Sequence, residues 1–213
     1  MIARQLEARG ITDERVLAAM GEIPRELFVR EADRELAYAD RALSIDCGQT
    51  ISQPWIVAAV CQGLELEGRE SVLEIGTGSG YSTAILSRLS AGLVSIERVE
   101  ELAAGARRRL EAAGIDGVEV RVADGSLGAP ADAPFDAIAV HAAVPAPPRA
   151  LLGQLAPGGR LVAPVAEDGH GEVLTRFRRR AEAGAAGDAT LAREPLAPCR
   201  FVPLIGAEGY PGD

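Results

Sequence analysis

The sequence predicts a doubly wound α/β fold, and three observations support this. Short apolar runs alternate with longer segments whose apolar residues recur at helical spacing. A glycine-rich turn follows the first core run, and three further β-like runs close the chain. Strands that alternate with helices pair in parallel through right-handed crossovers. We therefore expect a mostly parallel sheet with an antiparallel edge formed by the C-terminal strands.

The expected elements follow in order along the chain. Core strands are predicted at residues 71–75, 93–97, 118–124, 135–143 and about 159–165. Helices are predicted between them at 81–90, 98–114 and about 147–155. The β-like runs at 172–180, 189–196 and 199–206 predict the antiparallel edge. In such a sheet, ligands bind beyond the carboxyl ends of the parallel strands.

The glycine-rich turn "LEIGTGSGY" places Gly76, Gly78 and Gly80 directly after the first core strand. Glycines there let the backbone turn sharply and approach a ligand. The dinucleotide pattern G-x-G-x-x-G requires its third glycine where this chain has Tyr81. Glu74, two residues before the first glycine, suits a ligand that carries an ammonium group. The turn therefore indicates S-adenosylmethionine rather than NAD or FAD.

Two more acids follow the next two strands. Glu97 ends the second strand, where a carboxylate accepts hydrogen bonds from ribose hydroxyls. Asp124 ends the third strand, where it could accept from an adenine amino group. Taken singly, Glu97 could be a solvated strand end, and Asp124 with Gly125 could be only a turn. With Glu74, three acids at successive strand ends around one glycine loop favour a binding site.

The first 65 residues precede this core and are expected to cover it with helices. Helical patterns occupy residues 2–10 and 12–23, the second with Thr12 or Asp13 as its N-cap. A total of 213 residues suits one domain. We expect a single domain, with residues 1–65 as a helical N-terminal elaboration and residues 66–213 as the Rossmann-like core and C-terminal strands.

Composition argues against several classes of partner. The net charge of −9 disfavours a broad nucleic-acid surface, and no apolar run is long enough to span a membrane. We expect a cytoplasmic monomer without a nucleic-acid or membrane partner. The cysteines Cys47, Cys61 and Cys199 form no disulfide framework, and the spacing of His141 and His170 matches no metal-ligand pair. No metal site is expected.

With these residues identified, the chain resembles the protein-L-isoaspartate O-methyltransferases, which are SAM-dependent. The matching segments are "RELFV", "AYADRALSI", "GQTISQPWIVA", "VLEIGTGSGYSTAILS", "VSIERVEELA", "FDAIAVHAA", "LLGQLAPGGRLVAPV" and "RFVPLIG". They extend over nearly the whole chain. The resemblance implies transfer of a methyl group from S-adenosylmethionine to the α-carboxylate of L-isoaspartyl residues in damaged proteins or peptides, which serves protein repair.

The resemblance and the positions of residues around its motifs together predict a set of site residues. Ser52 matches the active-site serine of the family. The predicted cofactor-binding residues are Glu74, Gly76, Thr77, Gly78, Ser79, Gly80, Glu97, Arg98, Asp124 and Gly125. The predicted substrate-binding residues are Thr50, Ile51, Ser52, Gln53, Trp55 and His141.

Ser52 is expected to orient the acceptor carboxylate as a hydrogen-bond donor. The carboxylate is already an anion at neutral pH, so in-line approach to the methyl donor is the main requirement. No neighbouring base or G-x-S-x-G elbow indicates a nucleophilic serine. Ser52 could also be the N-cap of the helix that starts at Pro54, and both roles are compatible. Trp55 either lines the site or packs in the core.

Two departures from the family pattern keep other functions open. Asp46 and Cys47 stand where the family commonly has glycine and then an aromatic residue or histidine, and His141 replaces a small or hydroxylated residue. The alternative is a SAM-dependent O-methyltransferase that acts on a different carboxylate, a small molecule or a dedicated peptide partner. A SAM-binding regulator without activity is a third reading, but the retained Ser52 argues against it.

Overall fold

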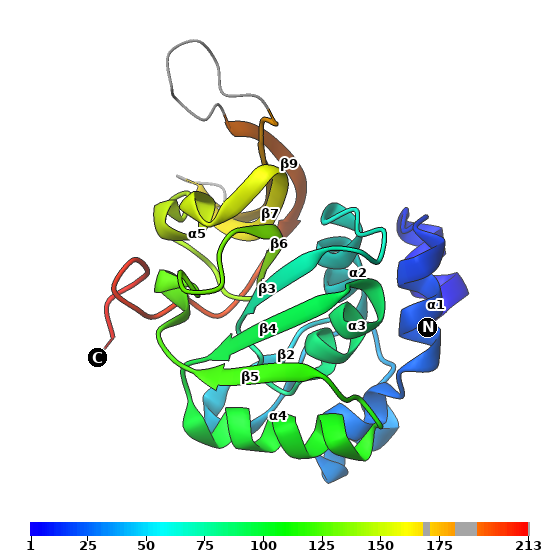
Figure 1. The fold of residues 1–213 in the computed structure, drawn as a ribbon. Coiled ribbons are helices and arrows are strands. Elements are labelled where there is room, and N and C mark those ends of the chain that lie inside the picture. The colour runs from blue at the N-terminus through cyan, green and yellow to red at the C-terminus, as the bar shows by residue number, and fades with distance from the viewer. Residues whose placement is uncertain (168–170, 182–190, 213) are drawn as a thin grey trace, which may run out of the picture.

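The computed structural model describes residues 1–167, 171–181 and 191–212, and it contains a seven-stranded sheet in the order β5-β4-β3-β6-β7-β8-β9 (Figure 1). The strands are β3 (Ser71–Ile75), β4 (Gly92–Glu97), β5 (Val118–Val122), β6 (Phe135–Val140), β7 (Leu155–Glu167), β8 (Gly171–Arg179) and β9 (Leu191–Cys199). The pairs from β5 through β7 are parallel, and β8 and β9 add in antiparallel fashion. The predicted fold class is confirmed.

Helices connect and cover these strands. They are α1 (Glu14–Glu22), α2 (Pro54–Gly63), α3 (Tyr81–Leu89), α4 (Glu100–Ala112) and α5 (Arg149–Gly153). Short helical turns lie at Ile2–Leu6, Glu7–Arg9, Arg25–Phe28, Glu31–Leu36, Asp46–Gly48 and Gly125–Leu127, and a small hairpin joins β1 (Leu43–Ser44) to β2 (Thr50–Ile51). No helix in the described part of the chain is both long and apolar enough to cross a bilayer.

The sheet carries an apolar cluster on each face, because successive side chains of a strand point to opposite sides. Along β3, Val72 belongs to the cluster that contains the buried residues of α1 to α4. Leu73 and Ile75 belong to the other cluster, together with residues of α5. All three side chains are at most 1% exposed. The two clusters thus enclose the central strand, and this packing fixes the position of the glycine loop that follows it.

The third expected C-terminal strand, residues 199–206, does not form, and that prediction is wrong. The segment instead makes a short parallel bridge to the chain beyond β6. Ala143 N–H donates to the Val202 carbonyl and Leu204 N–H donates to the Ala143 carbonyl, each at 2.8 Å. Pro203 has no N–H to donate to a continuous ladder. Residues 189–190 of the second expected run lie outside the described residues.

The helix starts resolve two capping predictions. Asp13 is the N-cap of α1, since its carboxylate accepts from the backbone N–H groups of Arg15 and Val16. The N-cap of α2 is Gln53, and no side chain caps that helix. Ser52 as an N-cap is therefore wrong. Its hydroxyl stays available for a ligand, while Pro54 occupies the first helical position as predicted.

Burial of β3 makes a first prediction. Leu73→Ala removes a fully buried side chain from β3, the strand between β4 and β6. It should lower the free energy of unfolding by about 2–5 kcal/mol. Urea unfolding followed by circular dichroism measures the change. Leu191→Ala is the control, because Leu191 is 38% exposed. Equal effects of the two substitutions would contradict this account of the core.

Candidate active site

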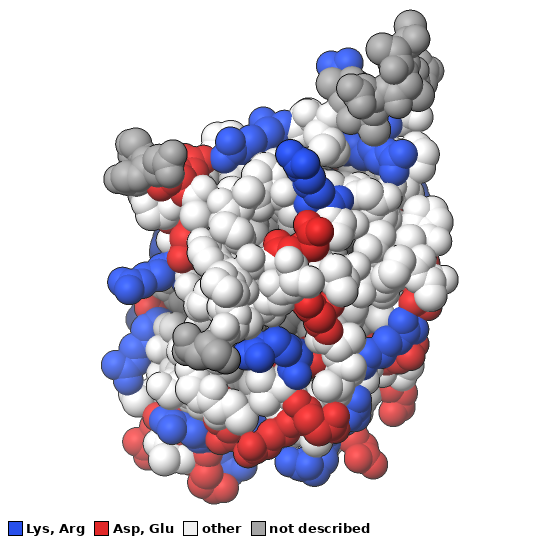
Figure 2. Space-filling view, turned by 90° about the vertical axis from the view of Figure 1, so that its left-hand side faces the viewer, with Lys and Arg blue, Asp and Glu red and all other residues white. Residues whose placement is uncertain are grey.

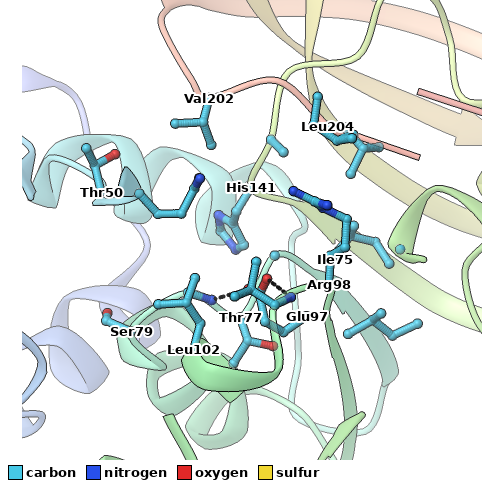
Figure 3. A pocket seen from close by; sticks show the side chains of 18 of the residues that line it. Thr50, Ile75, Thr77, Ser79, Glu97, Arg98, Leu102, His141, Val202 and Leu204 are labelled. Atoms are coloured by element: carbon cyan, nitrogen blue, oxygen red, sulfur yellow. Dashed lines mark hydrogen bonds between the residues drawn. The ribbon is translucent and has the colours of Figure 1, made fainter. Parts of the chain in front are cut away.

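A cavity of about 270 Å³ opens at the carboxyl ends of the parallel strands. Figure 1 shows β4 and β5 pointing toward this side, and Figure 2 shows the same side of the molecule. The middle of that face is mostly uncharged, and charged side chains of both signs gather toward its lower edge. The lining residues include Gly48, Thr50, Ile51, Ser52, Ile75, Gly76, Thr77, Gly78, Ser79, Ile96, Glu97, Arg98, Leu102, Gly125, His141 and Val202 to Ile205 (Figure 3).

The glycine loop after β3 forms the floor of this cavity. Gly76, Gly78 and Gly80 all have positive φ, at 92°, 55° and 91°. That backbone conformation favours glycine over any residue with a Cβ. A Cβ on Gly80 would also approach Ala106 Cβ to 3.3 Å, so the loop packs closely against α4. Gly80 itself does not line the cavity, whereas Gly76 and Gly78 do.

Glu74 is fully buried beneath the loop and does not line the cavity. Its Oε2 accepts hydrogen bonds from Thr83 Oγ1 of α3 and Ser95 Oγ of β4, both at 2.6 Å. Because Ser95 donates its only hydroxyl hydrogen to Glu74, it must accept from Thr77. The two hydroxyl oxygens of Thr77 and Ser95 are 2.5 Å apart. These bonds tie the end of β3 to α3 and β4. The expected place of Glu74 beside a ligand's ammonium group stays a prediction.

His141 follows β6 and faces Glu74. Its Nε2 lies 3.3 Å from Glu74 Oε1, and its side chain is only 6% exposed. A Cβ on Gly76 would lie 3.4 Å from His141 Cβ, so His141 and the glycine loop are in close contact. His141 also lines the cavity (Figure 3). His141 thus connects the buried acid with the cavity.

Glu97 lines the cavity at the end of β4, where the sequence placed it. Gly78 N–H donates to its Oε2 at 2.9 Å, and Val99 N–H donates to its Oε1 at 3.0 Å. These two bonds join the glycine loop to the β4–α4 turn; Figure 3 shows Glu97 at the centre of this arrangement. Arg98 is the exposed lining residue next to it.

Asp124 lies beside the cavity and binds the C-terminal segment. It accepts from the Ser126 N–H and hydroxyl, and from Ala207 N–H at 2.8 Å. Partial burial raises its pKa, but the hydrogen bonds from Ala207 and Ser126 outweigh this and hold the pKa below its ordinary value. Asp124 is not among the lining residues, whereas Gly125 is. A Cβ on Gly125 would lie 2.6 Å from Ile75 Cγ2, so only glycine fits there.

The C-terminal segment supplies a wall that sequence reasoning missed. Val202, Leu204 and Ile205 face the cavity opposite the glycine loop. Figure 3 shows Val202 and Leu204 across from Thr77 and Leu102. The sequence signal was present in "RFVPLIG", but its alternating apolar residues were interpreted as an edge strand. The bonds of Asp124 and Ala143 to this segment hold it in place.

A second cavity of about 470 Å³ adjoins the first. Thr50, Ser52, His141 and Val202 line both cavities. Thr50 is exposed and Ser52 half-buried. The predicted substrate-side residues Gln53 and Trp55 line only this second cavity of the two. Most of the predicted cofactor residues therefore line the first cavity, and the predicted substrate residues line the first cavity, the second cavity or both.

Two contacts orient the substrate-side residues. Gln53 Nε2 donates to the Asp40 carboxylate at 2.7 Å and to the Asp40 carbonyl at 3.1 Å. Trp55 Nε1 donates to the Arg9 carbonyl at 3.2 Å, and the Arg9 guanidinium lies 4.6 Å from the centroid of its ring. Trp55 is half-buried and packs partly against the core, so both sequence interpretations of it hold. Ile51 is buried in the core at 4% exposure and also reaches the first cavity.

Metal ligands do not gather anywhere in the described part of the chain. No group of three or more His, Cys, Asp or Glu side chains there could hold an ion. His170, the other histidine considered in the sequence, lies outside the described residues.

Comparison with known proteins agrees with this arrangement. The family model for protein-L-isoaspartate(D-aspartate) O-methyltransferase (PCMT) matches residues 1–209. The chain is 54% identical over 210 residues to protein-L-isoaspartate O-methyltransferase 2 of Pelobacter propionicus, covering 99% of this chain and 91% of that protein. It is 48% identical over 213 residues to protein-L-isoaspartate O-methyltransferase of Methanoculleus marisnigri, covering 100% and 93%.

Solved structures give the same result for the fold. A protein-L-isoaspartate O-methyltransferase structure is 30% identical, with a TM-score of 0.80, and the match covers 98% of this chain and 67% of that one. A Plasmodium falciparum structure in complex with S-adenosyl-L-homocysteine also has a TM-score of 0.80 at 24% identity, and the match covers 96% of each chain. By the match over residues 1–209 and the identity to these relatives, this chain belongs to the protein-L-isoaspartate(D-aspartate) O-methyltransferase family.

Proposed function

We propose that this protein transfers the methyl group of S-adenosylmethionine to the α-carboxylate of L-isoaspartyl residues in damaged proteins or peptides. Membership of the family and relatives at about 50% identity support this activity. The observation that carries it is the junction of the two cavities. A donor bound along the glycine loop and an acceptor bound beside Trp55 would meet at Ser52 and His141.

S-adenosylmethionine fits the residues of the first cavity. Gly76 and Gly78 allow a ligand to approach the backbone, and a Cβ at either would intrude on that space or strain the turn. Ile96 and Leu102 offer apolar surface for an adenine ring, and Glu97 offers carboxylate oxygens to ribose hydroxyls. The cofactor supplies an electrophilic methyl group on a positively charged sulfonium. We assign Thr77, Ser79, Arg98 and Gly125 to the same binding surface.

Two of the predicted cofactor-binding acids, Glu74 and Asp124, do not line the cavity. They act on the cofactor indirectly, through the segments that they hold in place. Glu74 ties the end of β3 to α3 and β4 at the base of the glycine loop. Asp124 fixes the C-terminal wall through Ala207. We propose that Gly80 contributes to cofactor binding indirectly, because its lack of a side chain lets the loop pack against α4.

On the acceptor side, Ser52 orients the carboxylate by donating its hydroxyl hydrogen. An isoaspartyl α-carboxylate is ionised at neutral pH and attacks without losing a proton, so the site needs no general base. Holding the acceptor oxygen in line with the methyl group is the main contribution, and such alignment is worth several orders of magnitude in rate. Thr50, Gln53 and Trp55 shape the approach, and Ile51 packs the loop onto the core.

One departure from the family pattern bears little on the acceptor. The Cys47 side chain is exposed, it contacts Glu101 at 3.5 Å, and it lines neither cavity. Asp46 lies 3.5 Å from Arg109 on the same outer surface. His141 is the departure that reaches the junction. Because Asp46 and Cys47 line neither cavity, we favour the isoaspartyl acceptor over a different carboxylate, a small molecule or a dedicated peptide partner.

The wider biology is proposed from the sequence alone. We propose that the 213 residues work as one domain and that the enzyme is a cytoplasmic monomer. The net charge of −9 supports a protein or peptide partner rather than a nucleic acid.

The proposed activity predicts selective methylation of isoaspartyl peptides. Two peptides that differ only in carrying L-isoaspartyl or L-aspartyl at one position are incubated with the protein and labelled S-adenosylmethionine. Label should enter only the isoaspartyl peptide, and mild alkali should release it as methanol because the product is an ester. Equal labelling of both peptides, or none, would refute the proposal.

The role of Ser52 predicts a loss confined to the acceptor. Ser52→Ala should lower kcat/KM for the isoaspartyl peptide roughly 10–100-fold, because a misaligned acceptor costs about that much. The Kd for S-adenosylmethionine, measured by calorimetry, should stay within about twofold of its value in the unchanged protein. Ser90→Ala is the matched control, since Ser90 Oγ bonds Leu86 O at the far end of α3. Unchanged peptide kinetics in Ser52→Ala would contradict the assignment.

A further inference from the structure

Arg25 is a fully buried arginine that contacts residues 50–53, which we call the acceptor loop. The activity described so far does not use it. It begins the helical turn Arg25–Phe28 and is 0% exposed. Its Nε donates to the Ala37 carbonyl and its Nη2 donates to the Ser52 carbonyl, both at 2.7 Å. The guanidinium therefore holds the backbone of the residue whose hydroxyl faces the acceptor.

The same guanidinium contacts the cofactor side of the site. It lies 4.8 Å from the centroid of the Tyr81 ring, and Tyr81 is the first residue of α3, directly after the glycine loop. Tyr81 is 1% exposed and packs against Phe28, with ring centroids 5.6 Å apart. Burial raises the pKa of Tyr81, so its phenol is neutral. Arg25 thus bridges the acceptor loop and the start of α3.

No carboxylate pairs with Arg25 among the residues that the structure describes. Burial lowers its pKa to about 10, which still leaves the group charged at neutral pH. A buried charge without a counter-ion is costly, and two charge-assisted hydrogen bonds with one aromatic face offset only part of that cost. An apolar residue would avoid the cost of burying a charge, but it would leave the Ala37 and Ser52 carbonyl groups without these donors.

We propose that Arg25 is a positioning residue for the methyl transfer. Its planar guanidinium holds the Ser52 backbone at a fixed position relative to the glycine loop, through its contacts with Ala37 and Tyr81. This inference rests on the proposed function of Ser52. The fixed fork of the guanidinium matters because it reaches two carbonyl groups while its face lies on a ring. A lysine ammonium keeps the charge but cannot reproduce that geometry. The role therefore depends on shape as well as charge.

The chain offers a matched control in Arg160. This arginine also donates to two backbone carbonyl groups, those of Leu64 and Glu65, and its side chain is 13% exposed. It lies 3.3 Å from the Glu70 carboxylate and lines neither of the two cavities that meet at Ser52. Arg25→Lys and Arg160→Lys should both lower stability, but only the first should alter the acceptor site.

The test compares these variants with the unchanged protein, under conditions in which circular dichroism shows each to be folded. Arg25→Lys should lower kcat/KM for the isoaspartyl peptide about tenfold or more and keep the Kd for S-adenosylmethionine within about twofold. The emission of Trp55, the one tryptophan of the chain, should shift because it follows Ser52 by three residues. Arg160→Lys should change none of the three readouts.

The following results would overturn the inference. If Arg25→Lys and Arg160→Lys have equal effects, or if Arg25→Lys weakens cofactor and peptide alike, Arg25 serves the fold and not the acceptor. Arg25→Met, which removes the charge, must lose at least as much peptide activity as Arg25→Lys, and a smaller loss contradicts the proposal. Inactivity of the unchanged protein on isoaspartyl peptides would instead refute the proposed function.

Discussion

The buried carboxylate of Glu74 is the constraint on which the site depends. It sits at the carboxyl end of the central strand, where an isolated charge would be strongly disfavoured, and it is stabilised by hydroxyl donors from α3 and β4. Thr77 continues this network into the glycine loop, and His141 Nε2 lies 3.3 Å from the other oxygen of the carboxylate. The end of β3, α3 and β4 are therefore tied together beneath the loop, because movement of α3 or β4 alone would take a hydroxyl donor away from the buried acid.

The rest of the site is built outward from that point by segments far apart in the sequence. Glu97 holds the loop from the neighbouring strand, and the C-terminal segment closes the cavity through Asp124 and Ala143. The acceptor loop comes from the N-terminal region and rests on the buried Arg25. Each contributor is anchored by hydrogen bonds to backbone groups. That anchoring suits a reaction whose main requirement is alignment of two bound partners.

The sequence predicted the parts of this structure that depend on local patterns. The strand at 71–75, its glycine loop and the acid at Glu97 could be found because strand period, turn chemistry and the carboxyl-end rule act over a few residues. The interpretations of residues 199–206 as a strand and of Ser52 as a cap failed because long-range contacts decided both. Val202 and Leu204 bond to Ala143, and the Ser52 carbonyl bonds to Arg25. Arg25 begins the segment "RELFV", but only the tertiary structure shows that its side chain is buried and that no acid among the described residues pairs with it.

The most direct measurement of the central claim is a crystal structure of the protein with S-adenosyl-L-homocysteine and an isoaspartyl peptide. The account predicts the sulfur atom beside the loop from Gly76 to Gly78 and the α-carboxylate at the Ser52 hydroxyl. The sulfur should face the acceptor oxygen across the junction, with room between them for one methyl group. A carboxylate bound away from Ser52, or a cofactor that leaves the glycine loop uncontacted, would contradict it.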